Sequence, residues 1–270
     1  MEKIYLNIAG FNFTLTLKNI QQNYYKEEFK KMLFKKYPKF IVNKKGKADF
    51  NLIIDYKGSV DVYIREHEDK IRYVYTNDYF IDSARNIANV NYTVSQLQFD
   101  NIIRELIDKY LFKKDKGFYL HGSAVGKKGE AFLFLGKSGA GKSTTAQLLD
   151  GLCKVLSDDF LIVKKNENNF YYYQSISYEK NWNFKRTNKS YRVGKVFFVK
   201  KANEFSLKKI ENKDKALSMV MKQFFTYDLK PDIQFPLLTA FVNKTDFYYI
   251  YVKKDQKLFQ GFFSEKVLKI

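Results

Sequence analysis

The sequence is poor in the residues that cross-link or stiffen a chain, with one cysteine and three prolines among 270 residues. Because Cys153 has no second cysteine to pair with, no disulfide can form within the chain, and we expect a reducing, cytoplasmic setting. No apolar run approaches the length of a membrane span, and residues 1–10 lack the charged start and long apolar stretch of a signal peptide. We therefore expect no membrane partner.

Arginine is also scarce, although the formal net charge is +19. Of the 48 basic residues, six are arginines, at positions 65, 72, 85, 104, 186 and 192. The lysines are scattered, and no zinc-finger, helix-turn-helix or RNA-recognition signature accompanies them. We expect a solvated, lysine-rich surface that is open to acidic partners, and no nucleic-acid partner.

A phosphate-binding loop is the most specific motif that is present. Residues 136–143 read G-K-S-G-A-G-K-S and fill every fixed position of G-x-x-x-x-G-K-[ST]. Residues 131–135 before the loop form an apolar run typical of a buried strand, and residues 144–149 after it resemble a helix start. This context aims backbone N–H groups at one point, where a phosphate can lie. The residues expected to bind ATP are Gly136, Lys137, Ser138, Gly139, Ala140, Gly141, Lys142, Ser143 and Thr144.

Within the loop, Lys142 is expected to reach the outer phosphates and the Ser143 hydroxyl to bind Mg²⁺. Asp158 and Asp159 follow an apolar segment, so they are expected at the end of a strand, where α/β sheets place ligand-facing residues. Adjacent strand residues point in opposite directions, so one carboxylate would hold Mg²⁺ through water and the other would accept the proton of an attacking hydroxyl. The alternative is a surface turn between strands.

His121 is one of two histidines and lies just before the strand that enters the phosphate loop. A lone histidine on a strand is more often packed or solvated than functional. His67 lies among charged neighbours on an expected hairpin turn. We expect it to be packed or solvated, with no functional role.

The amino-terminal part, residues 1–112, is expected to be a small α+β domain with a largely antiparallel layer. Alternating apolar residues on both sides of Ala9-Gly10 predict a hairpin. Residues 26–37 predict a short helix with Phe29, Met32 and Leu33 toward the interior. Further strands are expected near 50–56, 60–66 and 70–76. A connector helix over 94–112 would bury Leu97, Ile102, Ile103, Leu106, Ile107 and Leu111, with Thr93 or Ser95 as its cap.

The second domain, residues 113–270, is expected to be α/β, with a mixed β-sheet and flanking helices. One helix is expected after Lys142, and 213–225 has a helical pattern. The expected strands are 118–125, 131–135, 155–157, 160–164, 170–173, 195–200 and 247–253.

Taken together, three motifs resemble the kinase domain of the HPr kinase/phosphorylase superfamily. They are His121-Gly122, the loop 136–143 in the form G-x-S-G-x-G-K-S, and Asp158-Asp159 about sixteen residues after the loop lysine. The resemblance covers roughly residues 118–202 and implies a P-loop kinase fold, similar also to phosphoenolpyruvate carboxykinase, with ATP and Mg²⁺ as cofactors. The amino-terminal half is more similar to the extra domain of smaller proteins of this type, often labelled serine kinases.

The same resemblance implies roles for single residues. Asp159 falls on the family's proton acceptor, with Asp158 beside the metal, and His121 falls on its active-site histidine. Lys142 falls on the phosphate-binding lysine and Ser143 on the magnesium ligand. Glu179 is the nearest counterpart of the family's magnesium-binding glutamate.

The chain departs from the family at two places. It lacks the E-[IL]-R-G-x-G segment, and no arginine follows Arg192, where the family keeps a late catalytic arginine. These departures weigh against phosphorolysis and against HPr itself as the acceptor.

The leading hypothesis is an ATP- and Mg²⁺-dependent kinase that acts on a hydroxyl, that of a serine in a protein or peptide. The alternative is a nucleotide-binding regulatory module with little catalysis. A carboxykinase is a lesser alternative, because the chain has few arginines to bind a dicarboxylate substrate. The sequence leaves open both the acceptor and whether the chain forms a homo-oligomer.

Overall fold

The structure is a computed structural model of the 270-residue chain. The part that it describes comprises residues 3–18, 23–43, 46–56, 61–67, 70–77, 79–82, 87–90, 95–114, 116–174, 176, 187–226 and 235–269. Within these residues, none of the helices combines the length and the apolar character that crossing a membrane requires.

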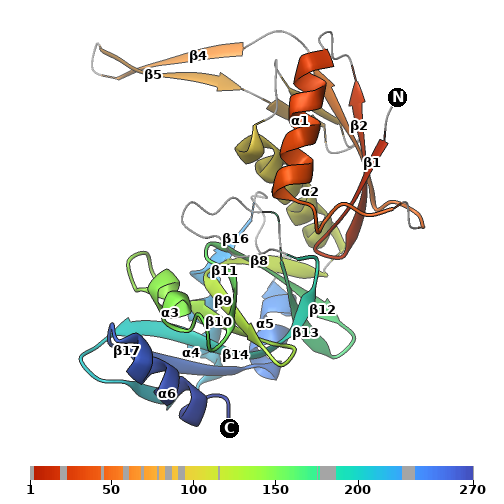
Figure 1. Ribbon diagram of the computed structural model, residues 1–270. Helices are drawn as coiled ribbons and strands as arrows, with labels where there is room; N and C mark the ends of the chain where they lie inside the picture. The colour runs from red at the N-terminus through yellow and green to blue at the C-terminus, as the bar shows by residue number, and fades with distance from the viewer. Residues whose placement is uncertain are drawn as a thin grey trace. The chain divides into compact units, whose positions relative to one another are not determined.

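The chain divides into two compact units (Figure 1). Unit 1 contains residues 1–106 and a short segment that includes Ile176, and unit 2 contains the remaining residues from Ile107 onward. The change between the units falls inside one helix, between Leu106 and Ile107. The domain boundary that the sequence suggests, at residues 112/113, stays a prediction.

Unit 1 begins with the predicted hairpin. Strands β1 (Lys3–Ile8) and β2 (Phe11–Lys18) pair antiparallel, and Ala9 and Gly10 turn the chain with φ values of 53° and 77°. Two successive residues with positive φ give the tight turn that matches the twist of a hairpin. Alternate residues of both strands are buried, so one face of the hairpin is packed and the other is accessible.

The sheet of unit 1 has the order β1-β2-β3-β7-β6, with β3 over Phe50–Tyr56, β6 over Tyr79–Asp82 and β7 over Ile87–Val90. Strands β2, β3 and β7 are parallel neighbours, while β1–β2 and β6–β7 pair antiparallel, so the sheet is mixed and not largely antiparallel as expected. The helix between β2 and β3 explains the difference, because a strand–helix–strand crossover returns the chain in its original direction. Strands β4 (Asp61–His67) and β5 (Lys70–Asn77) form a separate two-stranded sheet.

Helices α1 (Asn23–Lys36) and α2 (Gln96–Lys114) pack together through the ring of Phe99, which contacts Phe29 and Tyr37. Ser95 caps α2: its hydroxyl accepts from Gln98 N–H at 3.2 Å, while the Gln98 side chain accepts from Ser95 N–H at 2.7 Å. This reciprocal pair is a capping box, which fixes the start of the helix.

Most of the predicted core of α1 and α2 is buried, with two exceptions. Leu97, expected in the core of α2, is 55% exposed, and Phe99 is the buried residue of the first turn. Met32 of α1 is half-buried.

Unit 2 is built on one large mixed sheet, which confirms the expected α/β class. Its order is β11-β9-β10-β14-β13-β12-β8-β16, and β17 pairs with β14 and β15. The strands are β8 (Gly117–His121), β9 (Ser123–Lys127), β10 (Glu130–Leu135), β11 (Lys154–Ser157), β12 (Phe160–Asn166), β13 (Asn169–Tyr173), β14 (Ser190–Lys201), β15 (Ser206–Lys209), β16 (Phe224–Phe225) and β17 (Asp246–Val252).

The single strand expected over 118–125 is two strands, because the chain changes partners at Gly122. Strand β8 pairs with β12 and β16, whereas β9 pairs with β10 and β11. The core of the sheet consists of β10, β14 and β17, which are parallel and adjacent. Five of the six residues of β10 are buried, as the apolar run predicts, and Glu130 is half-buried.

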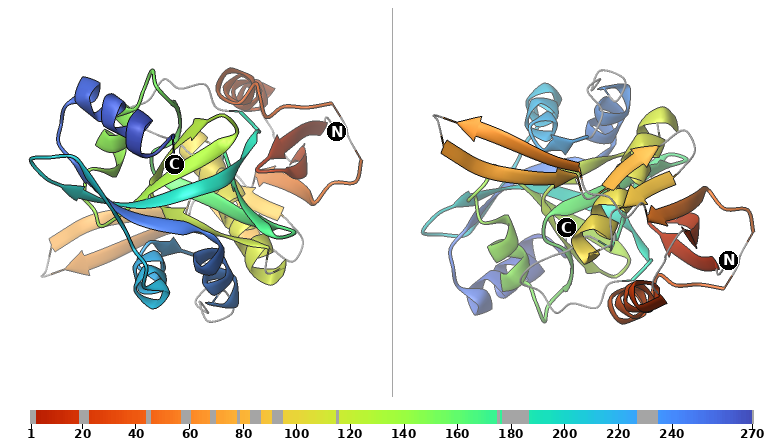
Figure 2. Two further views of the ribbon diagram at one scale, coloured as in Figure 1. Left: turned by 90° about the horizontal axis from the view of Figure 1, so that it is seen from below. Right: turned by 90° about the horizontal axis from the view of Figure 1, so that it is seen from above.

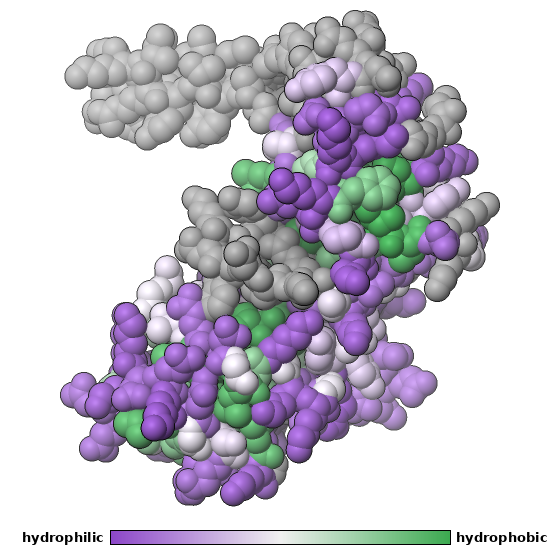
Figure 3. Space-filling model, viewed as in Figure 1, coloured by the Kyte–Doolittle hydropathy of each residue, from purple (hydrophilic) through white to green (hydrophobic). Residues whose placement is uncertain are grey.

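Four helices cover the two faces of this sheet (Figure 2). Helices α3 (Lys142–Leu148) and α6 (Gln256–Lys266) pack on one face around Phe134 and Phe263. Helices α4 (Lys213–Met221) and α5 (Phe235–Lys244) pack on the other face around Phe241 and Phe247. The side of unit 2 shown in Figure 3 is mainly hydrophilic, as expected for a lysine-rich surface.

Candidate active site

Three strand ends bring the predicted site residues to one edge of the unit 2 sheet. Strand β10 ends at Leu135, just before the loop, and its antiparallel neighbour β9 begins at that edge directly after His121-Gly122. Strand β11 is antiparallel to β9 and therefore runs in the same direction as β10, so it ends at the same edge with Asp158 and Asp159 following. The topology thus brings together three motifs that are separated in the sequence.

The loop between β10 and α3 depends on three glycines with positive φ: 146° at Gly136, 75° at Gly139 and 99° at Gly141. L-residues with side chains rarely adopt these conformations, so the motif needs glycine for its backbone shape. Gly141 is the N-cap of α3 and makes no side-chain hydrogen bond there. Instead, its carbonyl accepts from both the backbone N–H and the hydroxyl of Thr145, each at 2.8 Å, which holds the start of the helix.

Lys142 is buried although it is charged, with 7% of the residue exposed. Its Nζ donates to the carbonyl oxygens of Gly136 at 2.9 Å and Lys137 at 3.3 Å, so the ammonium group is folded back onto the loop. Burial lowers the pKa of Lys142, and the negative charges of Asp159 and Asp158 oppose that shift. The two carboxylates are therefore close enough to Lys142 to influence its protonation.

Asp159 is joined to the His121-Gly122 motif at two points. Nδ1 of His121 lies 3.0 Å from Oδ1 of Asp159, the distance of an N–H···O hydrogen bond, and Gly122 N–H donates to the Asp159 carbonyl at 2.9 Å. Both side chains remain accessible, with 44% of His121 and 43% of Asp159 exposed. The backbone hydrogen bond fixes Asp159, and the ion-pair contact places its carboxylate beside His121, while solvent or a substrate can still reach both groups.

Gly122 is required at its position by close packing. A Cβ atom there would lie 2.7 Å from the carbonyl oxygen of Phe134 and 2.7 Å from Cδ2 of Leu135. Because real Cβ atoms do not approach a backbone oxygen so closely, only glycine allows β8 and β9 to turn directly over the end of β10.

The remaining predicted site residues lie where the sequence indicates, with one outside the described part. Ser143 and Thr144 are half-buried in the first turn of α3, and Ser138 is exposed in the loop. Asp158 is half-buried in the bend between β11 and β12. Glu179 lies outside the described residues. Within the described ranges, no group of three or more His, Cys, Asp or Glu side chains could hold a metal ion.

Gln223, which follows α4, also contributes to the site, although the sequence does not indicate it. Its backbone carbonyl accepts from His121 N–H at 2.7 Å and so holds the strand end that carries the histidine. No sequence signal could reveal this contact, because every residue type has a backbone carbonyl.

Comparison with known families identifies the chain. The model of the family described as SynChlorMet cassette protein ScmC matches residues 89–226, just over half of the chain, and this stretch includes all three motifs of the site. The chain belongs to this family. No curated protein matches this ScmC-family chain.

The chain also shows distant similarity to solved structures. One is the Hpr(Ser) kinase/phosphatase from Coxiella burnetii, which is 11% identical, with a TM-score of 0.34. The match covers 56% of this chain and 97% of that one.

Proposed function

We propose that this chain is an ATP- and Mg²⁺-dependent kinase that transfers the γ-phosphoryl group to a hydroxyl, that of a serine in a protein or peptide. The observation that carries the proposal is the grouping at one sheet edge of the G-x-x-x-x-G-K-S loop with a carboxylate that lies 3.0 Å from a histidine. A loop of this type holds phosphates, and a nearby accessible carboxylate adds a proton acceptor for an attacking hydroxyl.

In this proposal, the loop backbone from Gly136 to Ser143 binds the phosphates of ATP. Lys142 breaks its bonds to the carbonyls of Gly136 and Lys137 and turns toward the outer phosphates. The exchange replaces two neutral carbonyl acceptors with a phosphate anion, so the ammonium group gains an ion pair. The buried lysine thus remains hydrogen-bonded in both states.

The residues present suit Mg²⁺, which in nucleotide sites is held by one or two protein groups together with phosphates and water. Ser143 in the first turn of α3 and Asp158 at the end of β11 are the groups that would hold it. When bound, Mg²⁺ would neutralise charge that develops on the transferred group.

Asp159 is the proposed general base. As the hydroxyl oxygen forms a bond to the γ-phosphorus, the bond to the oxygen that bridges the β- and γ-phosphates breaks, and ADP leaves. The hydroxyl proton moves to the Asp159 carboxylate, whose Oδ1 is held by His121. Because one oxygen is held in this way, the other can face the acceptor.

Transfer of labelled phosphate from Mg²⁺-ATP to a library of serine-containing peptides tests the proposal directly. Asp159→Asn keeps the size of the side chain but removes the base, so we expect transfer to fall about 10²- to 10⁴-fold. The affinity for ATP, measured by calorimetry, should change little. Asp150→Asn, at an exposed position after α3, is the matched control and should transfer phosphate like the wild type.

The proposed base is wrong if Asp159→Asn transfers phosphate as fast as the wild type. Tight binding of ATP without transfer to any acceptor would instead favour a nucleotide-binding regulatory module, which the absence of an arginine after Arg192 also favours.

A further inference from the structure

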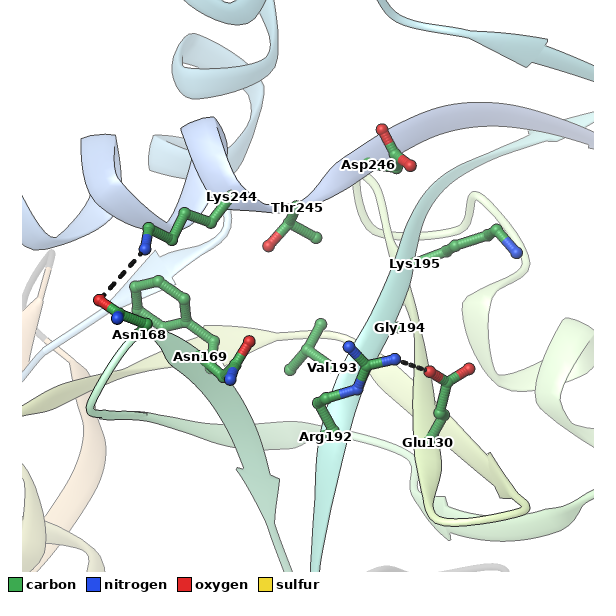
Figure 4. A pocket seen from close by; sticks show the side chains of 11 residues that line it. Glu130, Asn168, Asn169, Arg192, Val193, Gly194, Lys195, Lys244, Thr245 and Asp246 are labelled. Atoms are coloured by element: carbon green, nitrogen blue, oxygen red, sulfur yellow. Dashed lines mark hydrogen bonds and ion pairs between the residues drawn. The ribbon is translucent and has the colours of Figure 1, made fainter. Parts of the chain in front are cut away.

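A polar cleft of about 550 Å³ lies at the opposite edge of the unit 2 sheet from the phosphate loop (Figure 4). It is bounded by the start of β10, the β12–β13 turn, the middle of β14 and the junction between α5 and β17. Ligand pockets typically have volumes of about 300–1,000 Å³, so the cleft is large enough for a metabolite. The site proposed above uses none of its residues.

The cleft exists because β14 changes its neighbour on one side. Residues 190–192 pair with β13, whereas residues 195–201 pair with β17. Gly194, between the two pairings, is also the extra residue of a bulge against β10, since Ala131 pairs with Val193 and Phe132 with Lys195. Bulges in parallel pairs are rare and often re-aim side chains near functional sites. Here β13 and β17 separate at the bulge, and the cleft lies between them.

The carboxylates that line the cleft have cationic partners. Glu130 is paired with Arg192, and Asp246 lies 3.4 Å from Nζ of Lys209. Lys244 differs: its Nζ donates to Oδ1 of Asn168 across 3.4 Å, and no carboxylate within the described ranges forms an ion pair with it. Among the described residues, no carboxylate therefore balances the charge of Lys244 in this cleft.

Further hydrogen-bond donors surround Lys244. The side chains of Asn169 and Thr245 lie next to the same space (Figure 4), and Thr245 is buried, with 6% of the residue exposed. Nζ of Lys213 binds the backbone oxygens of Val242 and Thr245 at 2.9 and 3.0 Å, which adds positive charge at the end of α5. Val193 and Phe170 contribute apolar surface.

We propose that this cleft binds a small organic anion whose carboxylate or phosphate group contacts Lys244, Asn169 and Thr245. A cation with amide and hydroxyl donors is the chemistry that recognises an oxyanion. The proposal is independent of the proposed kinase activity, because the two sites share no residue.

Calorimetric titration of the full chain with L-malate, and separately with inorganic phosphate, tests the proposal and distinguishes a carboxylate ligand from a phosphate ligand. Saturation with a non-hydrolysable Mg²⁺-ATP analogue prevents phosphate from occupying the loop, and repeating the titration in the Lys142→Ala variant checks this. We expect one anion to bind at a single site under both conditions.

The variants Lys244→Gln and Thr245→Val locate the binding. Lys244→Gln removes the positive charge and Thr245→Val removes the hydroxyl donor, and each nearly keeps the shape of the side chain. Loss of a charged hydrogen-bond partner weakens binding about tenfold or more for Lys244→Gln. We expect a smaller loss for Thr245→Val. Lys257→Gln, an exposed substitution on α6, should change the affinity less than twofold.

Two results would overturn the proposal. One is that neither anion binds at millimolar concentration. The other is that binding is equally strong in the wild type, Lys244→Gln and Thr245→Val, because the anion then binds elsewhere.

Discussion

The two ends of the parallel strands β10, β14 and β17 hold their polar groups in different ways. At the carboxyl end, Lys142 is buried and bonded to loop carbonyls, and three positive-φ glycines set the backbone. At the amino end, exposed side chains pair with one another, as Arg192 does with Glu130. At the carboxyl end Lys142 is therefore held by backbone and burial, whereas at the amino end Arg192 is held by an accessible ion pair.

This difference predicts unequal consequences of substitution. Removing or adding atoms in a buried, hydrogen-bonded arrangement leaves unsatisfied groups or clashes, which typically cost about 1–3 kcal/mol, roughly a 5- to 150-fold effect. Exposed ion pairs contribute about 0–1 kcal/mol because water and salt compete for both partners. The carboxyl end should thus be sensitive to single changes, and the amino end tolerant.

The largest effect is expected from Lys142→Ala. A hydrogen bond to a charged group contributes about 1.5–3 kcal/mol, so the affinity for Mg²⁺-ATP should fall roughly 10- to 100-fold. Lys244→Ala, at the opposite end of the sheet, should leave that affinity unchanged. Calorimetry on both variants measures the contrast, and circular dichroism checks that both are folded. Equal losses in the two variants would show that the two ends are not distinct.

Gly122→Ala should give the next largest effect, on stability. The added methyl group would lie 2.7 Å from the Phe134 carbonyl oxygen, and such overpacking costs about 1–3 kcal/mol of unfolding free energy. Gly261→Ala in α6 is the matched control, because a Cβ there meets no atom within 4 Å. In that helix, alanine should stabilise the protein by up to about 1 kcal/mol. Urea denaturation distinguishes the two, and equal changes would contradict the packing argument.

The same two ends differ in how far the sequence predicts them. The phosphate loop is a local motif, and its flanking apolar run and helix start lie next to it in the chain, so its strand–turn–helix context could be predicted. The amino-end cleft draws on Glu130, Asn168, Gly194 and Thr245, which come from separate elements. No pattern in one segment indicates that these residues meet, because the meeting depends on β14 changing its neighbour.

Two expectations about the fold, the strand directions in unit 1 and the single strand over 118–125, differ from the structure for physical reasons. The pattern of strand, helix and strand over residues 11–56 indicated a parallel crossover, yet the hairpin at Ala9-Gly10 suggested an antiparallel layer. The division of the expected strand 118–125 at Gly122 has another cause. Glycine is needed there because Phe134 and Leu135 lie against it. Such a requirement arises from tertiary packing and leaves no periodicity in the sequence.

Helices α5 and α6 were also missed, although both carry start signals. Pro236 lies in the first turn of α5, a position where proline is favoured. The Asp255 side chain accepts from Leu258 N–H at 3.1 Å and caps α6. Gly261 in the middle of α6 lowers its helix propensity, so packing of Phe259 and Phe263 on the sheet is what stabilises this helix.

Glu130→Gln should have the smallest effect and tests the tolerant end directly. The substitution removes the negative charge that pairs with Arg192 but keeps the shape of the side chain beside Gly194. Because 54% of the Arg192 side chain is exposed, we expect a loss of less than about 1 kcal/mol of unfolding free energy, and an unchanged affinity for Mg²⁺-ATP. Urea denaturation and calorimetry measure the two quantities. Since Glu130 begins the strand that ends at the phosphate loop, a weakened affinity would mean that β10 couples the two ends, and the contrast between them would then fail.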